Sequence, residues 1–152
     1  MKLDFGSSIL MFYTDVTRSS SSILTEQKSG TPKNFGTLRK MGDQIKDIKK
    51  LLICGNKYEE VGQILHEGWL LKRKLANNIS NQKIDQMYEL AIDAGATGGK
   101  ISGAGGGGFL MLYVPKEKQN PVRVALKDYR ELPFMFDSLG SRIIFNMGRN
   151  YW

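Results

Sequence analysis

The chain has 152 residues, the usual size of one domain, with 41% apolar and 24% charged residues, a balance that excludes a disordered chain. Cys54 is the single cysteine and His66 the single histidine, which excludes an intramolecular disulfide, a zinc site built from thiolates and a metal site built from several histidines. The net charge of +7 favours anionic partners. The longest apolar run, residues 109–114, is far shorter than the ~20 residues of a membrane helix, so we expect a soluble cytoplasmic protein.

The first half of the chain predicts one strand followed by helices. Residues 8–13 form a short apolar run typical of a buried strand, and the serines at 19–22 can cap a short helix that continues to about Gln27. Apolar residues then recur at spacings of 3 and 4 from Leu38 to Leu52, with Gly55 in the position of a C-terminal cap. A second helix begins near Tyr58, and the two should pack as an antiparallel pair.

The second half predicts one more long helix and several strands. Ser80 or Asn81 can cap a helix that Gly95 ends, and residues 109–114 are the clearest strand in the chain. Pro121 suits the first turn of a short helix that runs to about residue 129. Two further short strands are expected at 132–136 and 142–145. This order favours an α+β fold, a ferredoxin-like antiparallel sheet with helices packed on one face.

Glycine is concentrated between residues 98 and 108, where it fills seven of eleven positions. Such a segment suits backbone with positive φ, close approach of the main chain to a ligand or another segment, or N–H groups arranged around an anion. The spacing G-x-G-x-x-G occurs here, but a strand follows instead of a helix, which excludes a dinucleotide fingerprint. A Walker loop is excluded because Phe109 follows the glycines where Lys and Ser or Thr are required. A flexible linker is disfavoured because it would carry more polar residues.

The segment 98–109, Gly-Gly-Lys-Ile-Ser-Gly-Ala-Gly-Gly-Gly-Gly-Phe, resembles the third motif of the GHMP kinases, a glycine-rich turn that leads into a strand of their C-terminal domain. Further segments are similar to the heptose 7-phosphate kinase branch of that superfamily. They include Phe12 to Ser19, Leu65 to Lys72, Ser80 to Asp85, Gly95-Ala96 and Gly140 to Phe145. The resemblance extends over roughly residues 8 to 146. Asp15 departs from it, because a small residue such as glycine is expected there.

The resemblance implies that residues 1–152 form a single C-terminal domain of a GHMP kinase. The phosphate-loop motif Pro-x-x-x-Gly-Leu-Gly-Ser-Ser-Ala of the N-terminal domain has no match in the chain, so we expect the ATP-binding domain to be absent. That domain would be the partner, and this chain alone would be inactive. The implied reaction transfers the γ-phosphate of ATP to the anomeric hydroxyl of a heptose 7-phosphate. ATP and Mg²⁺ belong to the complete kinase, and neither is expected to bind this chain tightly.

The resemblance also implies which residues meet the reactants. Arg18 and Lys100 are candidates for the phosphate of the sugar, although either could instead be a solvated surface charge. Ser102 could bond a phosphate or a sugar hydroxyl, or only cap the turn. Lys72 could reach a phosphate but is expected to be exposed, and His66 is expected to be a structural or surface residue rather than a general base. No residue is assigned to acid–base catalysis or to a metal. Support of the phosphate loop is expected from Gly103, Ala104, Gly105, Gly106, Gly107 and Gly108.

Two other functions remain open from the residues alone. One is a stand-alone ferredoxin-like binding module for RNA or a small anion, which the positive charge favours. The strands carry aromatic residues but no RNP pattern, so no nucleic acid is expected as a partner. The other is a structural or oligomerisation domain, in which the surface left uncovered by a missing N-terminal domain would lead to self-association.

Overall fold

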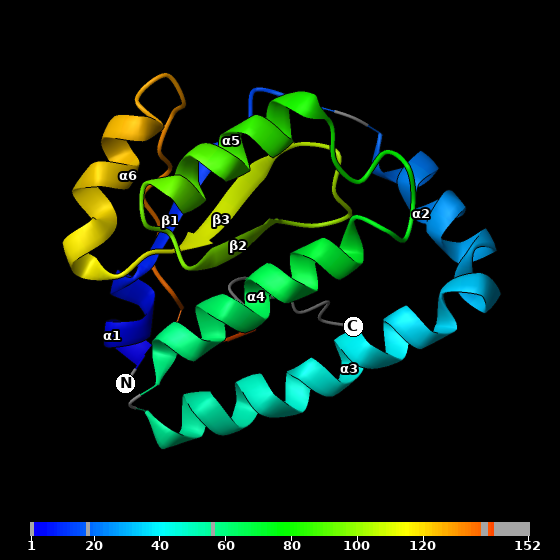
Figure 1. The fold of residues 1–152 in the computed structure, drawn as a ribbon, viewed down its shortest axis with the longest axis horizontal. Coiled ribbons are helices and arrows are strands. Elements are labelled where there is room, and N and C mark those ends of the chain that lie inside the picture. Colours follow the sequence, from blue (N-terminus) through cyan, green and yellow to red (C-terminus); the bar gives the residue numbers. More distant parts are fainter. Residues whose placement is uncertain (1, 18, 56, 138–139, 142–152) are drawn as a thin grey trace, which may run out of the picture.

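The computed structural model describes residues 2–17, 19–55, 57–137 and 140–141, and it combines helices with one antiparallel sheet (Figure 1). No helix among these residues is both long enough and apolar enough to cross a membrane. The elements in chain order are α1 (Lys2–Ser7), β1 (Ile9–Tyr13), α2 (Ser20–Ser29), α3 (Thr31–Cys54), α4 (Tyr58–Lys72), α5 (Gln82–Asp93), β2 (Gly98–Ile101), β3 (Phe109–Tyr113), the 3-10 turn η1 (Lys116–Lys118) and α6 (Gln119–Ala125).

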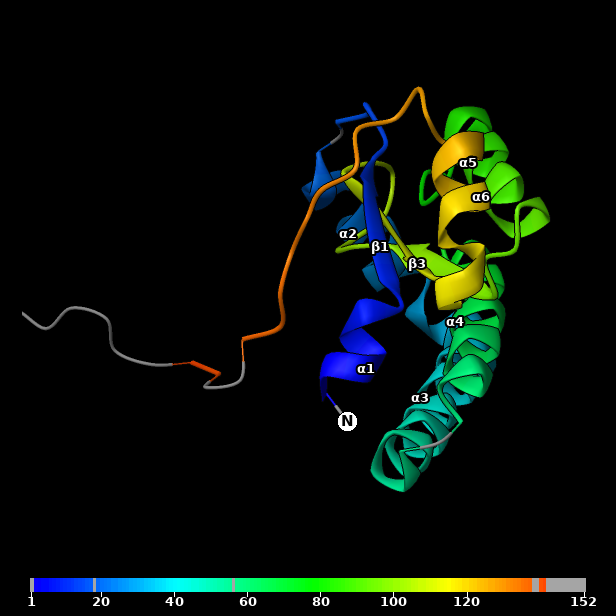
Figure 2. The same cartoon turned by 90° about the vertical axis from the view of Figure 1, so that its left-hand side faces the viewer.

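The sheet has the order β1-β3-β2, and both pairs of strands are antiparallel. Phe12 lies opposite Leu110, which lies opposite Ile101, and these three side chains are buried on the same face. They join one hydrophobic cluster with residues of α5 and α6, and Figure 2 shows both helices on one side of the sheet. The expected α+β fold with helices on one face of an antiparallel sheet is therefore confirmed.

The alternate residues of the strands point to the opposite face, which is more open. Side chains on this face are only half-buried, because successive residues of a strand alternate between the two faces and the helical cluster lies on the other one. They belong to Met11, Tyr13, Phe109 and Met111. The rings of Tyr13 and Phe109 lie 5.5 Å apart across the strands. Among the described residues, these four do not belong to the hydrophobic cluster on the other face.

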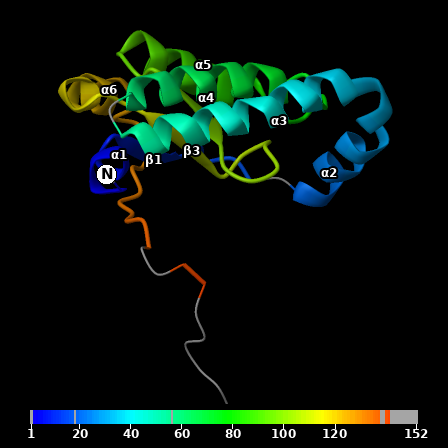
Figure 3. The same cartoon turned by 90° about the horizontal axis from the view of Figure 1, so that it is seen from below.

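Helices α3 and α4 form the expected antiparallel pair beside the sheet (Figures 1 and 3). Helix α3 begins with Pro32 in its first turn and ends at Gly55, which adopts the left-handed conformation at φ 74°. Helix α4 packs against the edge strand β2. That approach depends on Gly98, since a Cβ at this position would lie 2.0 Å from the carbonyl oxygen of Gly62.

Three predictions about elements differ from the structure. Residues 98–101, assigned above to the glycine-rich turn, form the edge strand β2, because pairing with β3 and the packing of α4 decide their conformation. Helix α6 starts at Gln119 and already ends at Ala125. Residues 132–136 are not a strand: the chain pairs with β1 only around Glu131, and Pro133 then removes a donor from the ladder. The strand expected at 142–145 lies outside the described residues.

Candidate functional site

The glycine-rich turn, residues 102–108, connects β2 to β3 and is fixed to two other parts of the chain. The Gly106 N–H donates to the carbonyl of Ile79 at 2.7 Å, and the Gly108 N–H donates to the carbonyl of Val16 at 2.9 Å. Thr14 bonds the Gly108 carbonyl twice, from its N–H at 2.8 Å and from its Oγ1 at 3.0 Å. The turn is therefore an ordered part of the domain, and the linker interpretation is wrong.

Two positions of this turn admit no side chain. Gly105 has φ 108°, and a Cβ there would lie 2.9 Å from the Ile79 carbonyl oxygen. Gly107 has φ 157°, and its Cβ would lie 2.2 Å from the Val16 carbonyl oxygen. Both features of the glycine-rich pattern, positive φ and close approach of main chain to main chain, are thus present.

The same turn keeps some of its donors unused. Within the described part of the chain, the N–H groups of Gly103, Ala104 and Gly107 donate no hydrogen bond. Gly103 is exposed, and a Cβ on it would have no atom within 4 Å. Exposed main-chain N–H groups on a bare turn are suited to contact an anion or a phosphate-binding loop.

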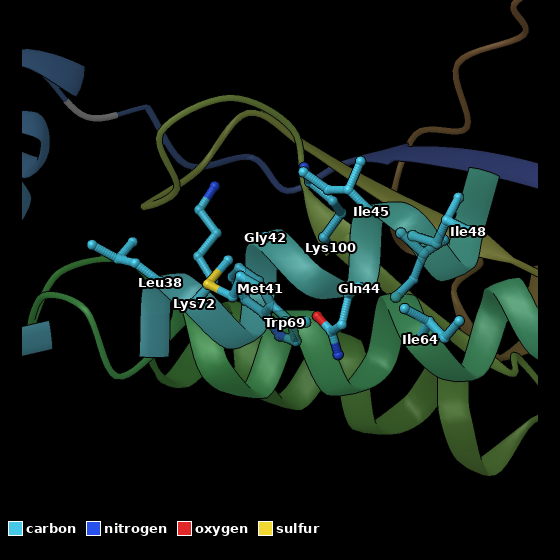
Figure 4. Close-up of a pocket in the computed structure, with 12 residues that line it drawn as sticks. Leu38, Met41, Gly42, Gln44, Ile45, Ile48, Ile64, Trp69, Lys72 and Lys100 are labelled. Atoms are coloured by element: carbon cyan, nitrogen blue, oxygen red, sulfur yellow. The ribbon is translucent and has the colours of Figure 1, made fainter. Parts of the chain in front are cut away.

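A groove lies beside this turn, between α3, α4 and β2, and has a volume of about 420 Å³. Figure 4 shows Lys72 extending from α4 toward the turn and Lys100 entering from β2. Apolar side chains and two glycines make up most of the remaining lining, with Gln44 as the other polar residue. The lining is completed by Leu38, Met41, Gly42, Ile45, Ile48, Ile64, Leu65, Gly68 and Trp69. We call this hollow the α3–α4 groove.

Lys72 links the α3–α4 groove to the glycine-rich turn. Its Nζ donates to the carbonyl of Gly103 at 2.5 Å. The side chain is half-buried, and burial, together with the nearby positive charge of Lys100, lowers the pKa of Lys72 to about 8. The expectation of an exposed Lys72 was wrong, although a signal existed: Gly68 and Lys72 are four residues apart and so share one helix face.

The other residues chosen from the sequence have different surroundings. Lys100 lies in β2 opposite Met111, and its side chain lines the α3–α4 groove. Ser102 is half-buried, and its N–H donates to the Phe109 carbonyl at 2.9 Å, which continues the hairpin ladder. Arg18 lies outside the described residues. The structure thus brings Lys100 and the glycine-rich turn to one place.

His66 has a structural role in the helical layer. Its Nδ1 lies 2.9 Å from the hydroxyl of Tyr88, and the two rings are stacked. Burial raises the pKa of Tyr88 to about 12, so the phenol stays protonated at neutral pH. The only histidine of the chain is therefore engaged between α4 and α5.

The described residues do not form a metal site. No group of three or more His, Cys, Asp or Glu side chains gathers anywhere in the described part of the chain. The chemistry available at the glycine-rich turn is main-chain hydrogen bonding and positive charge.

The sequence and its relatives agree on a family. Residues 39–131 match the family model described as GHMP kinases C terminal. The chain is also 30% identical over 122 residues to a D-glycero-alpha-D-manno-heptose 7-phosphate kinase of Campylobacter jejuni, a match over 78% of this chain. The chain belongs to the GHMP kinase family and corresponds to its C-terminal domain. It spans 36% of the length of that relative.

Other GHMP kinases resemble the chain in sequence and in fold. An L-fucokinase/L-fucose-1-P guanylyltransferase of Bacteroides fragilis is 29% identical over 76% of this chain and 12% of its own length. The crystal structure of Methanococcus jannaschii mevalonate kinase superposes with a TM-score of 0.64 at 26% identity, over 85% of this chain and 40% of that one. A putative sugar kinase of Campylobacter jejuni superposes with a TM-score of 0.51 at 24% identity, over 86% and 36%.

Proposed function

We propose that this chain is the acceptor-side domain of an ATP-dependent sugar kinase whose acceptor is a heptose 7-phosphate. The observation that carries the proposal is the glycine-rich turn, which is fixed at Ile79 and Val16 while Gly103, Ala104 and Gly107 keep free N–H groups. The similarity to a heptose 7-phosphate kinase over 78% of the chain supports this acceptor over fucose or mevalonate.

In the proposed reaction the anomeric oxygen of the sugar forms a bond to the γ-phosphorus of ATP. The bond between that phosphorus and the bridging oxygen breaks, and ADP leaves. Such a transfer depends mainly on positioning and on neutralisation of charge. The described residues can make these contributions. His66 is engaged with Tyr88, so in this proposal the proton of the hydroxyl passes to an acidic residue of the N-terminal domain.

Each residue of the site has a proposed part in this reaction. The glycine-rich turn approaches the phosphate loop of the N-terminal domain with bare main chain, and its free N–H groups stabilise negative charge there. Lys100 contacts the phosphate that the sugar already carries, with Arg18 and Ser102 as further contacts. Lys72 positions the turn through the Gly103 carbonyl.

A fusion protein tests the proposal. The N-terminal part of the Campylobacter jejuni relative is joined to this chain, and ATP consumption is measured with heptose 7-phosphate, L-fucose and mevalonate as acceptors. We expect turnover with heptose 7-phosphate and at least a hundredfold lower kcat/KM with the other two, because a desolvated charged contact discriminates strongly. The 152-residue chain alone is the control, and we expect it to be inactive. A normal kinase rate from the chain alone, or a preference of the fusion for mevalonate, would refute the proposal.

A further inference from the structure

The chemical character of the α3–α4 groove does not match that of a sugar site. Seven of its lining side chains are aliphatic, methionine or tryptophan, and its charged residues are two lysines with no carboxylate among the twelve lining residues. A sugar needs several hydrogen-bonding groups, whereas this lining offers an apolar floor and positive charge. The groove is therefore complementary to a molecule with an apolar body and an anionic end.

The described residues leave part of the apolar lining uncovered. Helix α3 has no fully buried residue, and Ile45 keeps 67% of its surface exposed although its helix neighbours Leu38 and Met41 contact the hydrophobic cluster. On the α4 side, Trp69 is 1% exposed, and the described residues provide no hydrogen-bond acceptor for its buried Nε1.

The two lysines lie where an anion would complete the site. Lys72 and Lys100 line the same groove, and the described partner of Lys72 is a main-chain carbonyl rather than a carboxylate. Burial lowers the pKa of Lys72, and repulsion from the ammonium group of Lys100 lowers it further. An anion between them would remove the repulsion and form charge-assisted hydrogen bonds.

We propose that the α3–α4 groove is a binding site for a small amphiphilic anion, a ligand with a short aliphatic body and a terminal carboxylate or phosphate. The aliphatic part lies along Met41, Ile45, Ile48 and Ile64, and the anionic end lies between Lys72 and Lys100. The volume of about 420 Å³ falls within the roughly 300–1,000 Å³ of small-molecule sites. The site rests on the groove alone and does not require the proposed kinase function.

The position of the site gives it a regulatory consequence, which, unlike the site itself, rests on the proposed kinase function. Lys100 belongs both to the groove and to the proposed contact with the phosphate of the acceptor, and Lys72 holds the glycine-rich turn through Gly103. An amphiphilic anion in the groove would therefore compete with the acceptor for Lys100. In the complete kinase it would act as an inhibitor competitive with the sugar phosphate.

Titration of this chain with four probes tests the site. Octanoate and octyl phosphate carry both features, 1-octanol has only the apolar body, and inorganic phosphate has only the charge. Binding is followed by the NMR signals of the Trp69 indole N–H and the Met41 methyl group. We expect octanoate and octyl phosphate to shift both signals and to bind at least tenfold more tightly than octanol or phosphate. The tighter of the two identifies carboxylate or phosphate as the preferred end.

Matched variants connect binding to the groove. Lys72→Met and Lys100→Met keep the aliphatic stems and remove the charges, so each should weaken octanoate about tenfold and leave octanol unchanged. Lys46→Met is the control, because Lys46 pairs with Asp43 on α3 and does not line the groove. These variants distinguish a contact with the ligand from a general effect of net charge.

A variant that fills the groove without disturbing the fold gives a second test. Gly42 lines the groove, and a Cβ there would have no atom within 4 Å, so Gly42→Leu should fold at least as well as the parent and fill the groove. Gly36→Leu, on the same helix and equally open but outside the groove, is its control. We expect octanoate binding to be lost in the first and kept in the second. Equal affinity for octanol and octanoate, unchanged binding in Gly42→Leu, or no shift at millimolar octanoate would overturn the proposal, and so would self-association that buries the groove.

Discussion

The two sides of the helical layer differ in how completely they are packed. On the α5 side, residues from β1, β3, α5 and α6 form one buried cluster in which Leu110, Leu112 and Met87 are fully shielded. On the α3 side, the helix is the longest in the domain among the described residues, yet none of its side chains is fully buried. The first region stabilises the fold, whereas the second leaves apolar surface and two lysines available to a ligand or a partner.

The largest expected effect on the free energy of unfolding comes from truncating one side chain in each of these two regions. Leu112→Ala should lower the free energy of unfolding by about 2–5 kcal/mol, because it removes buried methyl groups and leaves a cavity. Ile45→Ala should change it by less than about 0.5 kcal/mol, since two thirds of Ile45 is already exposed. Urea unfolding at constant m value measures both. Similar losses in the two variants would mean that α3 is packed as tightly as the sheet.

Glycine substitutions give the next effect and separate packing from backbone conformation. Gly98→Ala should cost about 1–3 kcal/mol, because the new Cβ would meet the Gly62 carbonyl oxygen at 2.0 Å and push α4 away from β2. Gly103→Ala meets no atom and should cost only the roughly 1–2 kcal/mol of a left-handed residue at φ 81°. Thermal unfolding of the two variants tests the difference. If Gly103→Ala proves the more harmful, the close contact between α4 and β2 is not what fixes this edge.

A smaller effect on stability is expected at Asp15. This residue precedes Val16, whose carbonyl accepts the hydrogen bond from the Gly108 N–H. Asp15 has φ 55°, a conformation that suits glycine, so Asp15→Gly should be more stable than Asp15→Val by about 1–2 kcal/mol. The ion pair of Asp15 with Lys83, at 3.1 Å, is largely exposed. Lys83→Met should therefore change the stability by no more than about 1 kcal/mol. An equal stability of the Gly and Val variants would show that the backbone at Asp15 is not strained.

The smallest effect, because solvent screens a half-exposed charge, is a dependence of stability on pH. Lys72 has a pKa of about 8 in the folded chain against 10.5 as its ordinary value, so between pH 8 and 10 the unfolded chain holds the proton that the folded chain has lost. Stability should therefore rise with pH in this window through Lys72. The charged group that faces it is Lys100, the Gly103 carbonyl accepts from it, and Gln44 is the polar residue of α3 in the same groove.

Chemical unfolding of the parent and of Lys72→Met at several pH values isolates this contribution. The rise between pH 8 and 10 should be smaller in Lys72→Met, and Lys46→Met should behave as the parent does. Tyr88 has the opposite sign and acts only above pH 10, because burial raises its pKa to about 12. Identical slopes in the parent and in Lys72→Met would contradict a half-buried, charged Lys72.

The sequence predicted the elements whose signals are local. Asn81 caps α5 by accepting from the Ile84 N–H at 3.0 Å, and Gly55 ends α3 in the left-handed conformation. Strand β3 and the antiparallel pair α3–α4 were likewise evident from apolar spacing. The expectation of a small residue at position 15 agrees with the positive φ found there.

The features that sequence reasoning missed depend on contacts between distant segments. Strand β2 contains two glycines and no alternation of apolar and polar residues, so its sequence does not indicate a strand. It forms because it pairs with β3 and packs against α4. Lys72 seemed a solvent-exposed helix residue, and only the position of the glycine-rich turn shows that it is held at Gly103. The α3–α4 groove is built from two helices and a strand, so no single motif predicts it.

The central claim, that this domain holds the acceptor, is tested most directly by steady-state kinetics of Lys100→Met in the fusion with the N-terminal part of the Campylobacter jejuni relative. We predict that the KM for heptose 7-phosphate rises about tenfold or more while the KM for ATP stays within twofold, because the lost charge contacts the sugar phosphate. An unchanged KM for the sugar phosphate, or a rise confined to ATP, would contradict the claim.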